Sequence, residues 1–293
     1  MTPVPHDDRL NDWFTPANVA RYYQETHWHY RRLWHGKRSL ALHYGYWDQH
    51  VNNHTTALHR LNEELARRAQ IATGEMILDA GCGWGGSSIW LAHNYDVRTL
   101  GLSIEPKQVQ QAQATARRLR LADKASFAVG DYHQMDVPDN AFDVVWAIES
   151  VCHSTNKGAF IREAWRVLKP GGRLVISDFF RTSRQLPDAD EQVLQQWLWQ
   201  WVIRDLATFQ EFQTEMEMAG FVGVKGEDIT QYIRPSARRL WLTGMGTAPC
   251  ALVLRALGVH TDLLHGNWKS SLLQYQALLR QTWRYGIFSA QKK

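Results

Sequence analysis

A glycine-rich turn between residues 76 and 86 constrains this chain more than any other feature of its sequence. The chain reads Met-Ile-Leu-Asp-Ala-Gly-Cys-Gly-Trp-Gly-Gly there, so a short apolar run ends at Asp79 and glycines follow at 81, 83, 85 and 86. Residues 87–93 then have a helical pattern. Glycine lets the backbone approach a ligand that a side chain would block, so this strand, turn and helix predict a nucleotide-binding site.

The acidic residue before the turn narrows the class of cofactor. The spacing of Gly81, Gly83 and Gly86 fits a dinucleotide fingerprint, so the glycines alone leave two cofactor classes open. Asp79 would repel a pyrophosphate but tolerates a cationic sulfonium. The phrase Leu-Asp-Ala-Gly-Cys-Gly resembles the first motif of class I S-adenosylmethionine-dependent methyltransferases. This resemblance implies S-adenosyl-L-methionine as the cofactor, bound by Asp79, Gly81 and Gly83.

Strands and helices alternate after residue 70, which predicts an α/β fold with a parallel sheet. The apolar runs predict strands at 76–80, 97–102, 125–129, 143–148, 173–179, 221–227 and 284–291. The helical patterns between them predict helices at 85–94, 106–120, 157–168, 189–203 and 208–219. This order resembles the doubly wound, seven-stranded, Rossmann-like methyltransferase sheet, whose last strand is antiparallel.

Two helical regions lie outside this alternation and predict the domain organisation. Helices at 16–34 and 55–70 predict an N-terminal lid over residues 1–70, followed by a cofactor-binding core at 71–228. Residues 229–283 predict a substrate cap of two or three helices, interrupted by Gly244, Gly246 and Pro249. Residues 284–293 then supply the final strand of the core.

Later motifs extend the resemblance to a branch of the family. Many methyltransferases have an acidic residue at the end of the second strand, which binds the ribose of the cofactor. Here Leu102 or Ser103 takes that position and Gln108 follows, a departure that resembles cyclopropane-fatty-acid synthases, tocopherol methyltransferases and sterol C-24 methyltransferases. The resemblance implies that Ser103 and Gln108 bind the ribose. Asp131 follows the third strand, where it would accept a hydrogen bond from the adenine amino group. The predicted cofactor-binding set is completed by Tyr132, Ala147, Tyr23 and Tyr46.

The segment from Trp146 to His153 bears on the methyl acceptor. It contains Ala-Ile-Glu-Ser-Val-Cys-His, which resembles a motif of sterol C-24 methyltransferases and of bacterial enzymes that C-methylate prenyl diphosphates. Methylating an alkene carbon leaves a carbocation that must be stabilised and then lose a proton. A carboxylate at a strand end suits both tasks, so Glu149 is the predicted base and His153 is predicted to orient it or relay the proton.

The predicted substrate-binding residues are aromatic rings and two arginines. The sequence holds 14 Trp, 10 Tyr and 10 Phe, and many lie outside the predicted sheet. The candidate rings to face the carbocation are Tyr23, Tyr44, Tyr46, Trp47, Trp197 and Trp201. Of these, Tyr44, Trp47, Trp197 and Trp201 are assigned to substrate binding. Arg234 and Arg238 would bind a diphosphate if the acceptor carries one, and Mg²⁺ would then bridge it; a solvated basic face is the other interpretation. No dedicated acidic metal motif is visible, so no metal ligand is assigned.

The overall composition excludes several functions. The net charge is only +4 and no run of lysine and arginine suggests nucleic-acid binding. No apolar run reaches the ~18 residues of a membrane span, and the N-terminus lacks the pattern of a signal peptide. Three widely spaced cysteines favour reduced thiols, and together these features predict a cytoplasmic protein. The motif at residues 146–153 and the aromatic residues predict a small hydrophobic molecule as its substrate. The aromatic content also predicts self-association as a homo-oligomer.

We therefore expect a C-methyltransferase that acts on an alkene carbon of an isoprenoid, such as a prenyl diphosphate, a terpenoid or a sterol-like molecule. The alternative is O-, N- or aromatic C-methylation of a phenolic, a tocopherol- or quinone-like compound, or another secondary metabolite. A methyltransferase fold retained only for binding is the third possibility that the residues leave open.

Overall fold

A mixed sheet of seven strands forms the centre of the computed structural model, which describes residues 12–34 and 40–293. The strand order is β3-β2-β1-β4-β5-β7-β6, and β7 runs antiparallel to both neighbours. The strands are β1 (Met76–Ala80), β2 (Arg98–Ser103), β3 (Ala125–Val129), β4 (Phe142–Ile148), β5 (Leu168–Arg181), β6 (Phe221–Asp228) and β7 (Trp283–Lys292). This confirms the predicted seven-stranded fold with an antiparallel last strand.

Helices cover both faces of the sheet, because successive residues of each strand point to opposite sides. On β4, Val144 and Trp146 pack into a core with α4 (His54–Arg68) and α5 (Gly86–Tyr95). Val145 and Ala147 pack into a second core with α7 (Lys157–Val167) and α9 (Phe209–Met218). Burial on both faces explains why these strands read as continuous apolar runs.

Local sequence signals set where several helices begin. The Thr15 side chain accepts a hydrogen bond from the Asn18 N–H and caps α2 (Pro16–Leu33). The Glu105 carboxylate caps α6 (Pro106–Arg118), which flanks β2 and β3 and has Pro106 in its first turn, as predicted. Thr208 forms a capping box with Glu211 at the start of α9.

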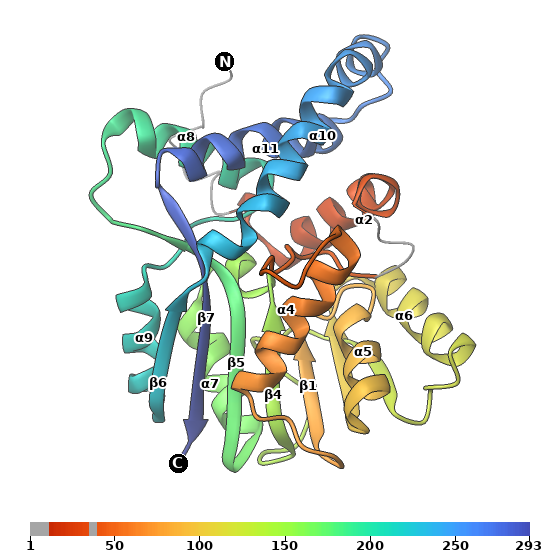
Figure 1. Ribbon diagram of the computed structural model, residues 1–293, viewed down its shortest axis with the longest axis vertical. Helices are drawn as coiled ribbons and strands as arrows, with labels where there is room; N and C mark the ends of the chain where they lie inside the picture. The colour runs from red at the N-terminus through yellow and green to blue at the C-terminus, as the bar shows by residue number, and fades with distance from the viewer. Residues whose placement is uncertain (1–11, 35–39) are drawn as a thin grey trace.

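A layer of helices lies over the carboxyl ends of the parallel strands (Figure 1). It consists of α2, α8 (Asp188–Gln200), α10 (Thr230–Ala256) and α11 (Asp262–Leu279), which come from three distant parts of the chain. Helix α11 holds the layer together because it contacts α2, α8 and α10. The predicted lid includes residues 1–11 and 35–39, which lie outside the described residues.

The structure corrects the predicted interruption of the cap. Helix α10 is continuous through Gly244, Gly246 and Pro249, and it also contains Pro235. A Cβ atom on Gly244 would lie 2.0 Å from Ser271 Oγ of α11, and the Gly244 carbonyl accepts a hydrogen bond from Trp268 Nε1. Gly244 therefore lets two helices pack closely, and this tertiary contact outweighs the local tendency to end the helix.

The packing of β7 gives a test of this core. Phe288 is fully buried and packs edge-on or tilted against Phe180, Phe209 and Phe212. We expect Phe288→Ala to lower the free energy of unfolding by about 3–5 kcal/mol, because it leaves a cavity between the sheet and α9. Urea denaturation followed by circular dichroism would measure this change.

The matched control is Met218→Ala, because the Met218 side chain is 77% exposed. Its effect should stay within about 0.5 kcal/mol. Similar losses for the two variants would contradict the placement of Phe288 in the core.

Candidate active site

A cavity of about 250 Å³ lies between the helical layer and the carboxyl ends of β1 to β4. This is where ligands bind in doubly wound folds. The predicted site residues that line it are Asp79, Gly81, Gly83, Ser103, Gln108, Tyr132, Glu149 and His153 from the strand ends, and Tyr23, Tyr44 and Trp201 from segments above them. The glycine turn and the predicted catalytic motif therefore face the same space.

Other predicted residues lie outside this cavity. Ala147 and Trp197 are fully buried in the two cores, and the Tyr46 ring stacks on Tyr232 with centroids 4.2 Å apart. Trp47 Nε1 donates a hydrogen bond to Ser236 Oγ, so this indole holds the chain against α10. The remaining three are Asp131, which is half-exposed beside the cavity, and Arg234 and Arg238, which are exposed on α10.

The glycine turn has the backbone geometry that its sequence predicts. Gly81 has φ +88°, and a Cβ atom there would lie 2.3 Å from the Cβ of Ser150. Asp79 Oδ2 accepts a hydrogen bond of 2.6 Å from Ser88 Oγ, and burial raises the pKa of Asp79 to about 6. A cation placed beside this buried carboxyl group would stabilise its ionised form.

Ser103 at the end of β2 and Gln108 in the first turn of α6 line the cavity, whereas Glu105 between them does not. Ser103 Oγ donates a hydrogen bond of 2.7 Å to Gln108 Oε1, and both side chains are buried. The two Glu105 oxygens accept from the Lys107 and Gln108 N–H groups at the start of α6. Glu105 thus caps the helix, so its carboxylate is already occupied. This supports the prediction that Ser103 and Gln108, rather than Glu105, bind the ribose.

The loop after β3 carries the last of the predicted cofactor groups. Asp131 Oδ1 accepts from the His133 N–H and lies 2.7 Å from His133 Nδ1, and these contacts lower the pKa of Asp131. The neighbouring Tyr132 donates a hydrogen bond to the Ser150 carbonyl and lines the cavity. The Asp131 carboxylate is therefore ionised, and it lies at the rim of the cavity next to Tyr132, which faces into it.

Glu149 is held in a strained position by two distant segments of the chain. Its φ is +48°, a left-handed conformation that a residue with a side chain adopts at a cost. Its Oε1 atom accepts hydrogen bonds of 2.7 Å from the Tyr44 N–H and from the Tyr285 hydroxyl. Burial raises the pKa of Glu149 to about 8, although both hydrogen bonds oppose this shift.

His153 is fixed separately from Glu149. Its Nε2 atom lies 2.9 Å from the Tyr23 hydroxyl, and its Nδ1 atom lies 3.4 Å from the Val202 carbonyl. Burial lowers the pKa of His153 to about 4, so the ring is neutral near pH 7. None of its described hydrogen bonds reaches Glu149, so Tyr44 and Tyr285 orient that carboxyl in place of the predicted His153.

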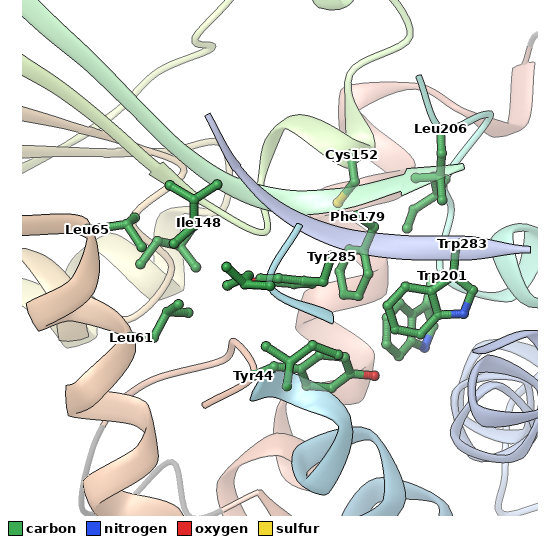
Figure 2. Close-up of a cluster of buried hydrophobic side chains, with 14 of the residues drawn as sticks. Tyr44, Leu61, Leu65, Ile148, Cys152, Phe179, Trp201, Leu206, Trp283 and Tyr285 are labelled. Atoms are coloured by element: carbon green, nitrogen blue, oxygen red, sulfur yellow. The ribbon is translucent and has the colours of Figure 1, made fainter. Parts of the chain in front are cut away.

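Aromatic rings that the sequence analysis missed complete the wall beside Glu149. Figure 2 shows Phe179 surrounded by Tyr44, Tyr285, Trp201 and Trp283, and the Phe179 centroid lies 5.5 Å from Tyr44 and 5.2 Å from Tyr285. Phe179 also lines the cavity. Its place at the end of the fifth strand is a signal that could have found it, because such ends border the site. Tyr285 has no comparable signal.

Known proteins resemble this chain over most of its length. Residues 78–176 match the methyltransferase domain family. The chain is 36% identical to the 27-O-demethylrifamycin SV methyltransferase of Amycolatopsis mediterranei, over 67% of this chain and 71% of that protein. It is 32% identical to the O-methyltransferase cnsE of Penicillium expansum, over 79% of this chain and 82% of that protein.

This chain belongs to the S-adenosylmethionine-dependent methyltransferases. Two solved structures share the fold of this methyltransferase. The [4+2]-cyclase SpnF superposes with a TM-score of 0.78 at 24% identity, covering 95% of this chain and 96% of that one. The geranyl diphosphate C-methyltransferase of Streptomyces coelicolor A3(2) gives a TM-score of 0.72 at 20% identity, covering 99% and 100%. The shared fold thus includes the helical layer as well as the sheet.

The glycine turn of this methyltransferase yields a test of cofactor binding. We expect Gly81→Ala to weaken the affinity for S-adenosylmethionine by about tenfold or more, because the new methyl group strains a left-handed backbone and displaces Ser150. Isothermal titration calorimetry would measure the dissociation constant.

The control is Gly74→Ala, because Gly74 has φ +84° and nothing within 4 Å of an added Cβ atom. It carries the same backbone strain without a clash and should bind the cofactor like the wild type. Equal affinities for all three proteins would contradict the close approach at Gly81.

Proposed function

We propose that this methyltransferase transfers a methyl group to an alkene carbon of an uncharged isoprenoid, of a terpenoid or sterol-like kind, and that Glu149 removes the resulting proton. One observation carries the proposal. A buried, hydrogen-bonded carboxyl group lies on the wall of an aromatic cavity that also contains the glycine turn. Such a carboxyl is costly unless it has a chemical role.

The cofactor would bind along the strand ends. Asp79 and the turn at Gly81 and Gly83 would take its charged methionine end, where a cation compensates a buried carboxylate. Ser103 and Gln108 would bind the ribose hydroxyls. Asp131 would accept a hydrogen bond from the adenine amino group, with Tyr132 beside it. The bound cofactor would supply an electrophilic methyl group on its sulfonium.

The aromatic wall suits the charge that the reaction creates. When the alkene attacks the methyl group, positive charge develops on the neighbouring carbon. The faces of Tyr44, Phe179 and Trp201 would each stabilise it by about 0.5–2 kcal/mol. A bound apolar acceptor would displace water from this space, and water would otherwise capture the cation.

Glu149 is arranged to take the proton. Tyr44 and Tyr285 hold its Oε1 atom, and no hydrogen bond to its Oε2 atom is found among the described residues. This second oxygen is therefore available to the cavity, which Glu149 lines. A nearby positive charge lowers the pKa of the carboxyl group and favours its ionised form. The C–H electron pair would form the new alkene while the proton moves to Glu149.

The charges around the cavity favour an uncharged acceptor. Within residues 12–34 and 40–293, no lysine or arginine lines the cavity, and Arg234 and Arg238 lie on the outer surface. The same residues contain no group of three or more His, Cys, Asp or Glu side chains that could hold a metal ion. The geranyl diphosphate enzyme of S. coelicolor is described with Mg²⁺, which applies to that protein. Our proposal therefore includes neither a diphosphate nor Mg²⁺.

O-methylation of a hydroxyl group on a large apolar metabolite is the second candidate. The cnsE relative reported above is an O-methyltransferase by name. A tocopherol O-methyltransferase of Arabidopsis thaliana is 32% identical over 61% of this chain and 53% of that protein. Trp201 Nε1 is buried beside the cavity, and no hydrogen-bond partner for it is found in the described structure. It would orient an acceptor oxygen, and Glu149 would then remove the hydroxyl proton.

Replacing the proposed base tests both candidates. We expect Glu149→Gln to lower kcat by about 10²–10⁴-fold, because general-base catalysis is lost while the shape of the side chain is kept. Its affinity for S-adenosylmethionine should not change. Turnover would be followed with labelled cofactor and a panel of terpenes, sterols, prenyl diphosphates, quinols and phenols.

The control is Glu217→Gln, an exposed position on α9 that should turn over like the wild type. Mass spectrometry and NMR of the labelled product would distinguish a new C–CH₃ group from a methyl ether. Near-normal turnover of Glu149→Gln would reject Glu149 as the base, and labelling of prenyl diphosphates alone would reject the uncharged acceptor.

The pH dependence gives an independent test of Glu149. The base acts in its deprotonated form, so kcat/KM should rise with pH through the pKa of about 8 in the free enzyme. Tyr285→Phe removes a hydrogen bond that stabilises the carboxylate, so the pKa of Glu149 should rise. The rising limb of the profile should then move to higher pH by about one unit.

The control is Tyr275→Phe, because Tyr275 of α11 packs against Trp241 of α10 and makes neither of the hydrogen bonds to Glu149. Its profile should match that of the wild type. If the rising limb of the kcat/KM profile does not move in Tyr285→Phe, a group other than Glu149 is responsible for the pH dependence.

A further inference from the structure

Helix α10 is apolar on two opposite faces. One face lines the cavity through Leu240, Thr243, Gly244, Thr247, Ala251 and Leu254. The other face is exposed, and at the helical period its residues form one stripe that we call the outer ridge. The outer ridge consists of Leu242, Met245, Pro249, Leu252, Val253 and Leu257, and its five large side chains are 50–70% exposed. A helix with one side in water normally carries polar residues on that side.

The charges near the outer ridge are almost all positive. Residues 229–261 contain four arginines and no aspartate or glutamate. Arg234 and Arg238 are exposed and share the helical face of the ridge, while Arg255 pairs with Asp262. Arg31 and Arg32 are exposed at the end of α2, which lies on the same side of the molecule as α10 in Figure 1.

The cavity reaches the surface at α2, on the side of the molecule where α10 lies (Figure 1). Trp28 of α2 lines the cavity and is 53% exposed, and the Arg32 guanidinium lies 5.6 Å from the centre of the Trp28 ring. An aromatic ring and a cation of α2 therefore lie at the edge of the opening. Amphipathic aromatic and arginine side chains are typical of groups that sit at a lipid–water boundary.

We propose that the outer ridge of α10 docks on the surface of an anionic lipid bilayer and that the apolar acceptor passes from the lipid into the cavity. The apolar side chains would enter the boundary between headgroups and acyl chains, and the arginines would bind lipid phosphates. This is surface docking, since none of the described helices is long and apolar enough to cross a membrane. A second copy of the chain is a less favourable occupant, because the ridge would place arginines opposite arginines.

The delivery of the acceptor rests on the proposed function, but the docking does not. Vesicle binding can be measured on the full chain without acceptor, and the Glu149→Gln variant should bind vesicles like the wild type. A failure of docking can therefore be told apart from a failure of the proposed chemistry.

The experiment is flotation of the protein with vesicles. We expect the wild type to float with vesicles of phosphatidylcholine and phosphatidylglycerol, and less with phosphatidylcholine alone. The variant Leu252→Glu with Leu257→Glu should bind the anionic vesicles about tenfold or more weakly, since two anchors are lost and two negative charges are added. The control pair Leu119→Glu with Met218→Glu changes exposed residues on other elements and should leave binding unchanged.

A second variant keeps the test independent of folding. Arg234→Gln with Arg238→Gln should weaken binding to anionic vesicles and leave binding to phosphatidylcholine unchanged, with the same thermal unfolding as the wild type. Wild-type protein that does not float, or ridge variants that bind like it, would overturn the proposal. A change of oligomeric state in the ridge variants by light scattering, without vesicle binding by the wild type, would identify the ridge as an interface between copies.

Discussion

The two hydrogen bonds to Glu149 Oε1 are the contact on which the rest of the site depends. They join the end of β4 to the segment after α2 through the Tyr44 N–H and to the last strand through the Tyr285 hydroxyl. A carboxyl group buried among aromatic rings would otherwise cost several kcal/mol of unfavourable desolvation. The structure satisfies one oxygen and leaves the other to the cavity, which is the geometry on which the proposed role of Glu149 as the base rests.

The position of β7 makes the hydrogen bond between Tyr285 and Glu149 possible. Because the last strand inserts antiparallel between β5 and β6, Tyr285 pairs with Phe179 and its side chain reaches the end of β4. Asp178 supports the same region, since its carboxylate accepts from the N–H groups of Cys152 and Phe179. The turn that follows Glu149 is therefore held from beneath by a second buried acid, whose charge also raises the pKa of Glu149.

The helical layer forms the side of the cavity that faces the strand ends. Helices α2, α10 and α11 do not lie on either face of the sheet. Helix α11 packs against both α2 and α10, and the three helices enclose the space above the strand ends (Figure 1). Helix α10 has a double role in this arrangement, because one face closes the cavity and the other meets solvent. This outer face carries exposed apolar side chains and arginines, whereas a helix with one side in water usually carries polar residues there.

The sequence by itself determined the alternation of the sheet and the glycine turn, because these follow from local patterns of glycine and apolar residues. The preference for Ser103 and Gln108 over Glu105 as ribose ligands rests on a family resemblance and stays a prediction, with Glu105 used as the cap of α6. It also placed Glu149 at a strand end. Only the tertiary structure decided that Tyr285 and Tyr44, rather than His153, orient Glu149, and that Trp197, Trp47 and the two arginines of α10 face away from the cavity. It likewise decided that α10 runs through Gly244 and Pro249. These outcomes depend on contacts between residues far apart in the chain, and side-chain direction in a helical layer is set by its neighbours rather than by local sequence.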